Sequence, residues 1–159
     1  MGEIVKVNKA IEIAGKLKKI NKKIVLVGGC FDILHVGHVI FLEKAKKKGD
    51  VLMVLLESDV QIKKLKGEDR PINKQVDRAK LLSNLKMVDV VVNLIEMKSG
   101  KDYNDLVLKI KPDVIAITSD DRIKEIKRAQ ARMVGGKLSV VVKRMEGYST
   151  SLLLNKIIK

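Results

Sequence analysis

The chain has 159 residues, which is the size of one domain with a buried core. Aromatic residues make up only 3% of it and there is no Trp, which argues against a stacking surface for single-stranded nucleic acid. The formal net charge of +14 indicates either an anionic partner or lysines on solvated helix faces, and the candidate partners are nucleic acid, an acidic membrane and phosphorylated metabolites.

Cysteine usage and hydropathy restrict the cellular setting. Cys30 is the only cysteine, so an internal disulfide is excluded and a reducing compartment is indicated. The first nine residues lack the apolar core of a signal peptide, and no apolar run approaches the ~20 residues of a membrane-spanning helix. We therefore expect a single cytoplasmic domain over residues 1–159 that binds neither membrane nor nucleic acid.

The first half of the chain alternates between helical and strand patterns. Apolar residues recur with the helical period in its first segment, and short β-branched runs indicate strands buried on both faces. The expected elements are a helix at Ile4–Ile20, a strand at Ile24–Val27, a helix at Gly37–Lys48 and a strand at Val51–Leu56.

The second half continues the alternation after a polar segment, residues 58–71, in which we expect a loop with a short helical piece. The expected helices are Gln75–Leu85, Tyr103–Ile110, Asp121–Met133 and Ser149–Ile158, and the expected strands are Val88–Val92, Asp113–Thr118 and Leu138–Val142. This order predicts an α/β fold, a Rossmann-like doubly wound sheet of about five parallel strands with helices on both faces. Ligands of such folds bind beyond the carboxyl ends of the strands, so the residues after each strand are the candidates for function.

Two histidines stand after the first predicted strand. His35 and His38 are the only histidines in the chain, and they lie at the turn into a helix. A helix N-terminus offers free backbone N–H groups and a positive dipole end, and two imidazoles there can hydrogen-bond phosphate oxygens. Gly37 between them allows a phosphate or nucleobase to approach the backbone closely. The pattern predicts a phosphate-binding centre.

Other chemistries fit this segment less well. Zinc would need a third ligand that does not stand nearby. Cys30 as a nucleophile would need a base and an orienting group, so a small packing residue is the better interpretation. Neither the Walker phosphate loop nor the dinucleotide-binding glycine pattern is present.

The segment Gly29–His38 resembles the His-x-Gly-His signature of the cytidylyltransferase-like nucleotidyltransferases, and the likeness covers nearly the whole chain. Three later segments, Lys64–Gly67, Arg70–Asn73 and Asp77–Ala79, resemble the adenylyltransferase domain that activates heptose 1-phosphate. Residues Glu146–Ser151 resemble the Gly-Ile-Ser-Thr-Thr element near the C-terminus of the family.

Two departures keep the substrates open. Residues Ile117–Asp121 stand where the heptose enzyme typically has Lys-Gly-Gly-Asp-Tyr, and Arg144 resembles the start of the Arg-Thr-Glu-Gly-Ile-Ser-Thr-Thr motif of glycerol-3-phosphate cytidylyltransferase. ATP with a sugar phosphate and CTP with glycerol 3-phosphate are thus both alternatives, and an adenylyltransferase acting on flavin or pantetheine is a third. Outside the enzyme class, the charge leaves a basic nucleic-acid-binding module as the alternative.

The resemblance implies transfer of a nucleoside monophosphate from ATP or CTP to a phosphorylated small molecule, with release of pyrophosphate. It implies catalytic roles for His35, His38, Lys66 and Arg144. It also implies nucleotide contacts from Gly29, Cys30, Phe31, Asp32, Gly37, Lys64, Asp120, Tyr148, Ser149 and Thr150. Arg78 and Arg70 would bind acceptor or triphosphate oxygens.

The expected cofactor is Mg²⁺, held mainly by triphosphate oxygens and water, because no dedicated carboxylate cage is visible. We therefore assign no residue as a metal ligand, although Asp32 is a candidate either for approaching the ion or for orienting the loop. Members of the family are commonly dimers, so the resemblance also implies a homodimer.

Overall fold

The computed structural model describes residues 1–143 of the chain, which form one six-stranded sheet with helices around it. The strands are β1 (Glu3–Lys6), β2 (Ile24–Gly29), β3 (Val51–Leu56), β4 (Val90–Asn93), β5 (Val114–Thr118) and β6 (Lys137–Val142). The helices are α1 (Val7–Lys19), α2 (Val36–Lys46), α3 (Asp59–Lys66), α4 (Gln75–Ser83), α5 (Gly100–Ile110) and α6 (Lys124–Met133).

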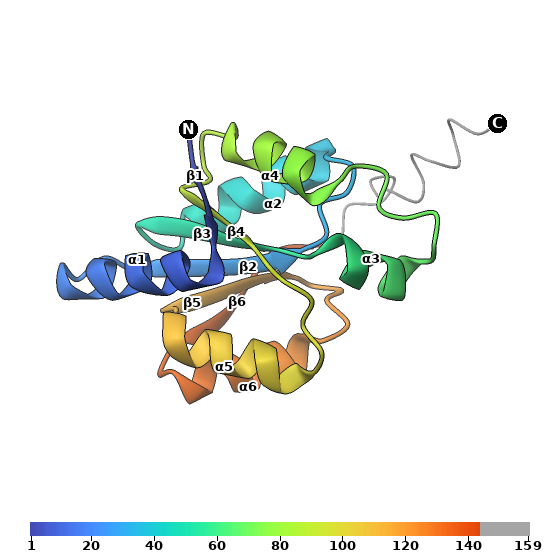
Figure 1. Ribbon diagram of the computed structural model, residues 1–159. Helices are drawn as coiled ribbons and strands as arrows, with labels where there is room; N and C mark the ends of the chain where they lie inside the picture. The colour runs from blue at the N-terminus through green and yellow to red at the C-terminus, as the bar shows by residue number, and fades with distance from the viewer. Residues whose placement is uncertain (144–159) are drawn as a thin grey trace.

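All neighbouring strands are parallel, in the order β1-β4-β3-β2-β5-β6. From β2 the chain builds outward through β3 and β4, and it then crosses to the other side of β2 to form β5 and β6 (Figure 1). The strand order therefore reverses between β2 and β5. The predicted doubly wound α/β fold is confirmed, and the reversal marks where such folds bind ligands.

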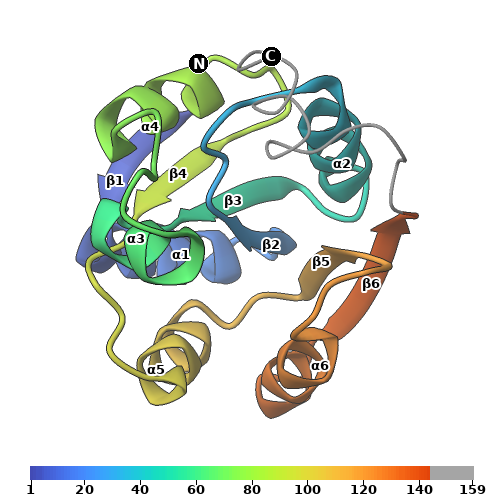
Figure 2. The same cartoon turned by 90° about the vertical axis from the view of Figure 1, so that its right-hand side faces the viewer.

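Helices cover both faces of the sheet (Figure 1). Because successive strand residues point to opposite faces, Leu26 packs toward α1, α5 and α6, whereas Val25 and Val27 pack toward α2 and α4. Ala10 and Ala14 of α1 are fully buried, and their small side chains let that helix lie close to the sheet. Helix α3 belongs to neither layer and lies beyond the carboxyl end of β3 (Figures 1 and 2).

The prediction of one helix over Ile4–Ile20 was wrong at its start, where the chain forms the edge strand β1. This strand pairs with β4, for example Ile4 with Val91, and only Val5 among its residues is buried. A single buried side chain in four residues leaves no period-two signal, so the pattern could not reveal the strand. Pairing of β1 makes six strands where about five were expected.

Helix starts also differ from the predicted ones because polar side chains set them. Helix α5 begins at Gly100, where the Asp102 carboxylate accepts the backbone N–H of Ser99 at 3.0 Å as part of a capping box. Helix α6 begins at Lys124, after Asp121 accepts the N–H of Ile123 at 2.9 Å. The predicted helix Ser149–Ile158 lies outside the described residues.

Burial on α4 yields a stability test with a matched control. Leu82 is fully buried against the sheet, whereas its neighbour Leu81 is 48% exposed. We expect Leu82→Ala to lower the free energy of unfolding by about 2–5 kcal/mol, because it leaves a cavity. Leu81→Ala should cost less than about 1 kcal/mol. Chemical denaturation measures both, and equal losses would contradict the described packing of α4.

Candidate active site

The turn from β2 into α2 depends on a glycine and on a residue with positive φ. Phe31 has φ 44° and a buried ring. A Cβ on Gly29 would lie 2.9 Å from Cε2 of that ring, so only glycine allows the two to approach this closely. The Phe31 ring then lies against His38, with centroids 5.1 Å apart. Packing among the residues of this turn thus holds the histidine pair in position.

His35 and His38 come together at the N-terminus of α2. Their rings stack with centroids 3.8 Å apart and an interplanar angle of 23°. Burial lowers the pKa of His38 to about 3, and the charges of His35 and Lys66 act in the same direction; burial also lowers the pKa of His35. The Nδ1 atom of each ring is buried and has no hydrogen-bond partner among residues 1–143. At neutral pH the pair therefore consists of two neutral imidazoles beside free helix N–H groups.

Asp32 connects this turn to the segment before α4. Its buried carboxylate accepts the Nε–H of Arg70 at 2.6 Å and the backbone N–H groups of Ile72 and Asn73 at 3.1 and 2.9 Å. Burial acts to raise the pKa of Asp32, but these hydrogen bonds and the Arg70 charge outweigh it and hold the pKa below its ordinary value. The side chain is 0% exposed, so its geometry fits orientation of the loop and leaves no open oxygen for a metal ion.

Arg78, predicted as a substrate-binding residue, is buried in the protein. Its side chain is 0% exposed, and its guanidinium donates to the carbonyl oxygens of Cys30 at 2.5 Å, Glu57 at 2.9 Å and Asn73 at 2.9 Å. It also donates to Asp59 Oδ1 at 2.7 Å. These four hydrogen bonds within the protein give Arg78 a structural role, and its contact with phosphate oxygens stays a prediction. Arg78 instead joins the carboxyl ends of β2 and β3 beneath the site.

Two of the three lysines of α3, Lys64 and Lys66, have different surroundings. Lys64 forms an ion pair with Glu96 at the molecular surface. Lys66, in contrast, lies close enough to act on the pKa values of both His38 and Cys30. Two residues along an α-helix correspond to a rotation of about 200°, so Lys64 and Lys66 cannot serve one site equally. Lys66 therefore acts electrostatically on the histidine pair, whereas Lys64 is paired with Glu96, and the nucleotide contact of Lys64 stays a prediction.

The remaining predicted residues are distributed around the same edge. Cys30 is half-buried, and burial raises the pKa of its thiol, which is the opposite of an activated nucleophile. Gly37 lies in the first turn of α2, and Asp120 lies exposed in the connection from β5 to α6. The residues that fall outside the described part of the chain are Arg144, Tyr148, Ser149 and Thr150.

Two further polar residues at this edge were not predicted individually. Glu57 follows β3, and Tyr103 Oη donates to its carboxylate, lying 3.0 Å from each oxygen. Burial raises the pKa of Glu57, although Tyr103, Lys127 and Arg78 act in the opposite direction. The sequence could have indicated Glu57, because its carboxylate directly follows the apolar run Val51–Leu56 and the residues after each strand are candidates for function. Tyr103 had no such signal, since only packing of α5 brings it there.

Two negative findings concern residues 1–143 alone. They contain no group of three or more His, Cys, Asp or Glu side chains that could hold a metal ion. None of their helices combines the length and the apolar character needed to cross a bilayer.

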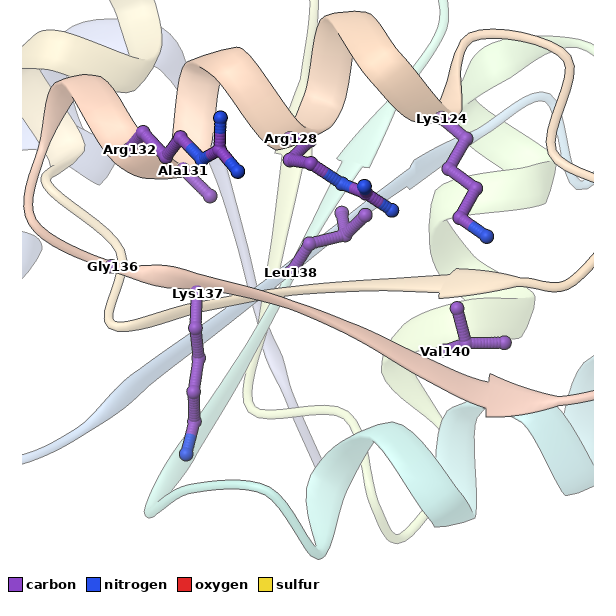
Figure 3. A pocket seen from close by; sticks show the side chains of 8 residues that line it. All are labelled: Lys124, Arg128, Ala131, Arg132, Gly136, Lys137, Leu138 and Val140. Atoms are coloured by element: carbon purple, nitrogen blue, oxygen red, sulfur yellow. The ribbon is translucent and has the colours of Figure 1, made fainter.

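A hollow with a volume of about 390 Å³ lies between α6 and the edge strand β6 (Figure 3). Its basic side chains are Lys124, Arg128, Arg132 and Lys137, above an apolar floor that includes Leu138. Among residues 1–143, none of those predicted for the active site lines this hollow.

A doubly wound parallel sheet with two stacked histidines at the helix that follows its central strand defines the class of Rossmann-like nucleotidyltransferases. The chain belongs to the cytidylyltransferase-like family, whose model matches residues 26–156. The family and the enzyme class inferred from the His-x-Gly-His segment are thereby confirmed.

Similar proteins include the bifunctional protein HldE of Nitratiruptor sp., which is 42% identical over 158 residues and 97% of this chain. The bifunctional protein HldE of Helicobacter pylori is 42% identical over 144 residues and 89% of this chain. The chain spans only 32% and 29% of the lengths of these two relatives. It therefore corresponds to about a third of each.

Two solved structures share the fold. A lipopolysaccharide core biosynthesis protein of Thermoplasma volcanium has a TM-score of 0.62 and 31% identity, covering 81% of this chain and 100% of its own. The pantoate-beta-alanine ligase of Francisella tularensis has a TM-score of 0.62 and 17% identity, covering 92% of this chain and 69% of its own. At that identity the second likeness concerns the fold alone.

Removal of the Arg78 side chain tests its structural role. Arg78→Met leaves three carbonyl oxygens and the Asp59 carboxylate without their donor, and we expect a loss of about 3–5 kcal/mol in the free energy of unfolding. Arg122→Met, at an exposed position, should change it by less than about 0.5 kcal/mol. Denaturant titration at pH 7 compares them, and a loss below 1 kcal/mol for Arg78→Met would contradict the assignment.

The buried state of His38 predicts its titration. With a pKa of about 3 in the folded protein and 6.5 as the ordinary value, His38 stays neutral between pH 8 and 5 while the unfolded chain takes up a proton. Its contribution to stability is therefore complete above about pH 6.5 and declines as the pH falls. We expect the His38 ring resonances, identified by comparison with His38→Gln, to show no inflection in this range. An inflection near pH 6.5 would contradict the described burial.

Proposed function

We propose that the chain transfers AMP from ATP to a sugar 1-phosphate, with heptose 1-phosphate as the favoured acceptor, and releases pyrophosphate. The observation that carries this proposal is the stacked pair His35 and His38 at the N-terminus of α2, in a chain of the cytidylyltransferase-like family. The 42% identity to HldE proteins and the likeness to a lipopolysaccharide core biosynthesis protein favour a carbohydrate acceptor. Adenylyl transfer follows from the resemblance to the heptose-activating domain.

The reaction forms one bond and breaks one. An oxygen of the acceptor phosphate attacks the α-phosphorus of ATP in line, the bond from that phosphorus to the bridging oxygen of the β-phosphate breaks, and pyrophosphate leaves with the electron pair. Because no covalent enzyme intermediate is needed, the protein contributes position and electrostatic stabilisation.

The histidine pair supplies N–H donors to the triphosphate in this proposal. Each Nδ1 atom is buried and has no hydrogen-bond acceptor among the described residues that would hold a proton on it. The ring proton is therefore available on Nε2, where the N–H can donate to phosphate. A bound triphosphate brings negative charge, which raises the pKa of both imidazoles and favours their charged forms in the complex. The free N–H groups of Val36 and Gly37 at the start of α2 add to the same positive potential.

Lys66 is the proposed counter-charge for the phosphates, since it already lies within electrostatic reach of His38. Arg70 is held by Asp32 at the rim of the same turn, and its acceptor contact stays a prediction. The roles of Arg144, Tyr148, Ser149 and Thr150 are proposals from the family resemblance alone.

Mg²⁺ remains the expected cofactor, bound through triphosphate oxygens and water. The buried Asp32 carboxylate faces the protein, so triphosphate oxygens and water would supply the ligands of the ion. When bound, the ion would neutralise part of the triphosphate charge. A cytoplasmic location and a homodimer are further proposals from the sequence.

The alternative is cytidylyl transfer to glycerol 3-phosphate, which the likeness of Arg144 and its neighbours to the cytidylyltransferase motif favours. A pyrophosphate-release assay with ATP or CTP, each combined with heptose 1-phosphate or glycerol 3-phosphate and Mg²⁺, separates the two. We expect turnover with ATP and heptose 1-phosphate. Turnover with none of the four combinations would contradict the proposal.

Matched variants test the residues in the same assay. We expect His35→Ala or His38→Ala to lower kcat about 10²–10³-fold, because each removes donors that stabilise developing phosphate charge. Lys66→Ala should lower kcat/KM by a similar factor. Lys64→Ala, on the opposite side of α3, should change it less than about threefold, as for an exposed ion pair. Equal effects of the two lysine variants would contradict the described orientation of α3.

A further inference from the structure

The sheet opens between β2 and β5 at its carboxyl edge. The two strands pair only at Val25 with Val114 and at Leu26 with Ile115. Beyond Leu26, β2 continues against β3 as far as Gly29, while β5 continues against β6. Figure 2 shows β2 and β5 apart at this edge. Gly28 is exposed although it belongs to a central strand. Doubly wound sheets bind ligands in a crevice at the point where the strand order reverses, and at this point the backbone of β2 is accessible at Gly28.

Glu57 borders this crevice on the same side of the sheet. Leu26 of β2 and Leu55 of β3 both pack toward α5, and the alternation of strand residues places Gly28 and Glu57 on that side as well. The backbone N–H of Glu57 donates to the Gly29 carbonyl at 3.1 Å, which fixes the residue beside the end of β2. Tyr103 reaches the carboxylate from α5.

The Glu57 carboxylate has unused hydrogen-bonding capacity. An ionised carboxylate offers about four acceptor sites, and the Tyr103 hydroxyl is its one hydrogen-bond donor within residues 1–143. The nearest cations are engaged elsewhere, since Lys127 pairs with Asp121 at 2.7 Å and Arg78 pairs with Asp59 at 2.7 Å. Partial burial of a carboxylate without more donors is costly, so a function is the natural reason for it.

Electrostatic contacts connect Glu57 with the phosphate end of the site. The Cys30 thiol lies within the electrostatic influence of both Glu57 and Lys66, and Lys66 acts on His38 in turn. The positive potential at α2 suits phosphate, whereas the negative charge of Glu57 repels it. A ligand that spans this gradient has phosphate at one end and a neutral group rich in hydroxyl donors at the other.

We propose that Glu57 accepts hydrogen bonds from two hydroxyl groups of a sugar ring that lies in the crevice beside Gly28, with Tyr103 as the residue that positions the carboxylate. The ring belongs either to the acceptor or to the ribose of the nucleotide, which share this chemistry. Glycine at position 28 leaves room for the ring, because no Cβ projects into the crevice. The identity of the two ligands rests on the proposed function, but the hydroxyl contact does not.

The test is equilibrium binding by calorimetry, which needs no turnover. Wild type and Glu57→Gln are titrated with ATP and Mg²⁺, with 2′,3′-dideoxyATP and Mg²⁺, with heptose 1-phosphate, and with inorganic phosphate. We expect Glu57→Gln to weaken one sugar-bearing ligand about tenfold or more, since a charge-assisted hydrogen bond is lost. The matching probe without hydroxyls should bind both proteins within twofold. Weakening of ATP identifies the ribose, and weakening of heptose 1-phosphate identifies the acceptor.

Two controls separate recognition from a structural role. Glu43→Gln, at an exposed position of α2, should leave all four affinities unchanged. Tyr103→Phe should weaken the same ligand as Glu57→Gln by a smaller factor. The melting temperature of Glu57→Gln should equal or exceed that of wild type, because a partly buried charge is removed.

Three results would overturn the inference. They are unchanged affinities for both sugar-bearing ligands, equal weakening of the probes that lack hydroxyls, and a lowered melting temperature with all ligands affected alike. Loss of turnover in the pyrophosphate assay with intact binding would instead count against the proposed function alone.

Discussion

The buried guanidinium of Arg78 is the constraint on which the active edge depends. It holds the Cys30 and Glu57 carbonyl groups, and thereby the ends of β2 and β3, together with the Asn73 carbonyl of the segment before α4. A planar group with several donors in fixed directions can join three backbone segments at once, which a lysine could not. The histidine turn and the Glu57 crevice both start from positions that this one side chain sets.

Asp32 also stabilises the site, because its carboxylate accepts hydrogen bonds from Arg70, Ile72 and Asn73 and so connects these residues to the histidine turn. Its low exposure and its several donors make the connection strong, since each hydrogen bond to a buried carboxylate avoids a desolvation cost. Together with Phe31, whose ring lies against His38, it helps to place the two imidazoles. Preorganisation of this kind keeps the donors in position before phosphate binds.

The charge of the side chains differs between the two ends of the site, although the chain as a whole is strongly basic. Neutral histidines and Lys66 lie at one end, and the Glu57 carboxylate lies at the other. Most of the positive charge lies elsewhere, for instance at the hollow between α6 and β6. The gradient, more than the net charge of +14, is what would orient a substrate with one phosphate end and one neutral end.

The sequence by itself determined the elements whose signal is local. Apolar runs revealed β2 and β3, and the two histidines after β2 pointed to a phosphate site, because strand and helix periods and strand-end positions depend only on neighbouring residues. Only the tertiary structure decided what Arg78 and Glu57 contact, since their partners lie up to 48 residues away. An arginine in a helix looks the same whether it faces solvent or the ends of two strands. Whether such an arginine is buried or exposed depends on topology and packing, which a local sequence pattern does not encode.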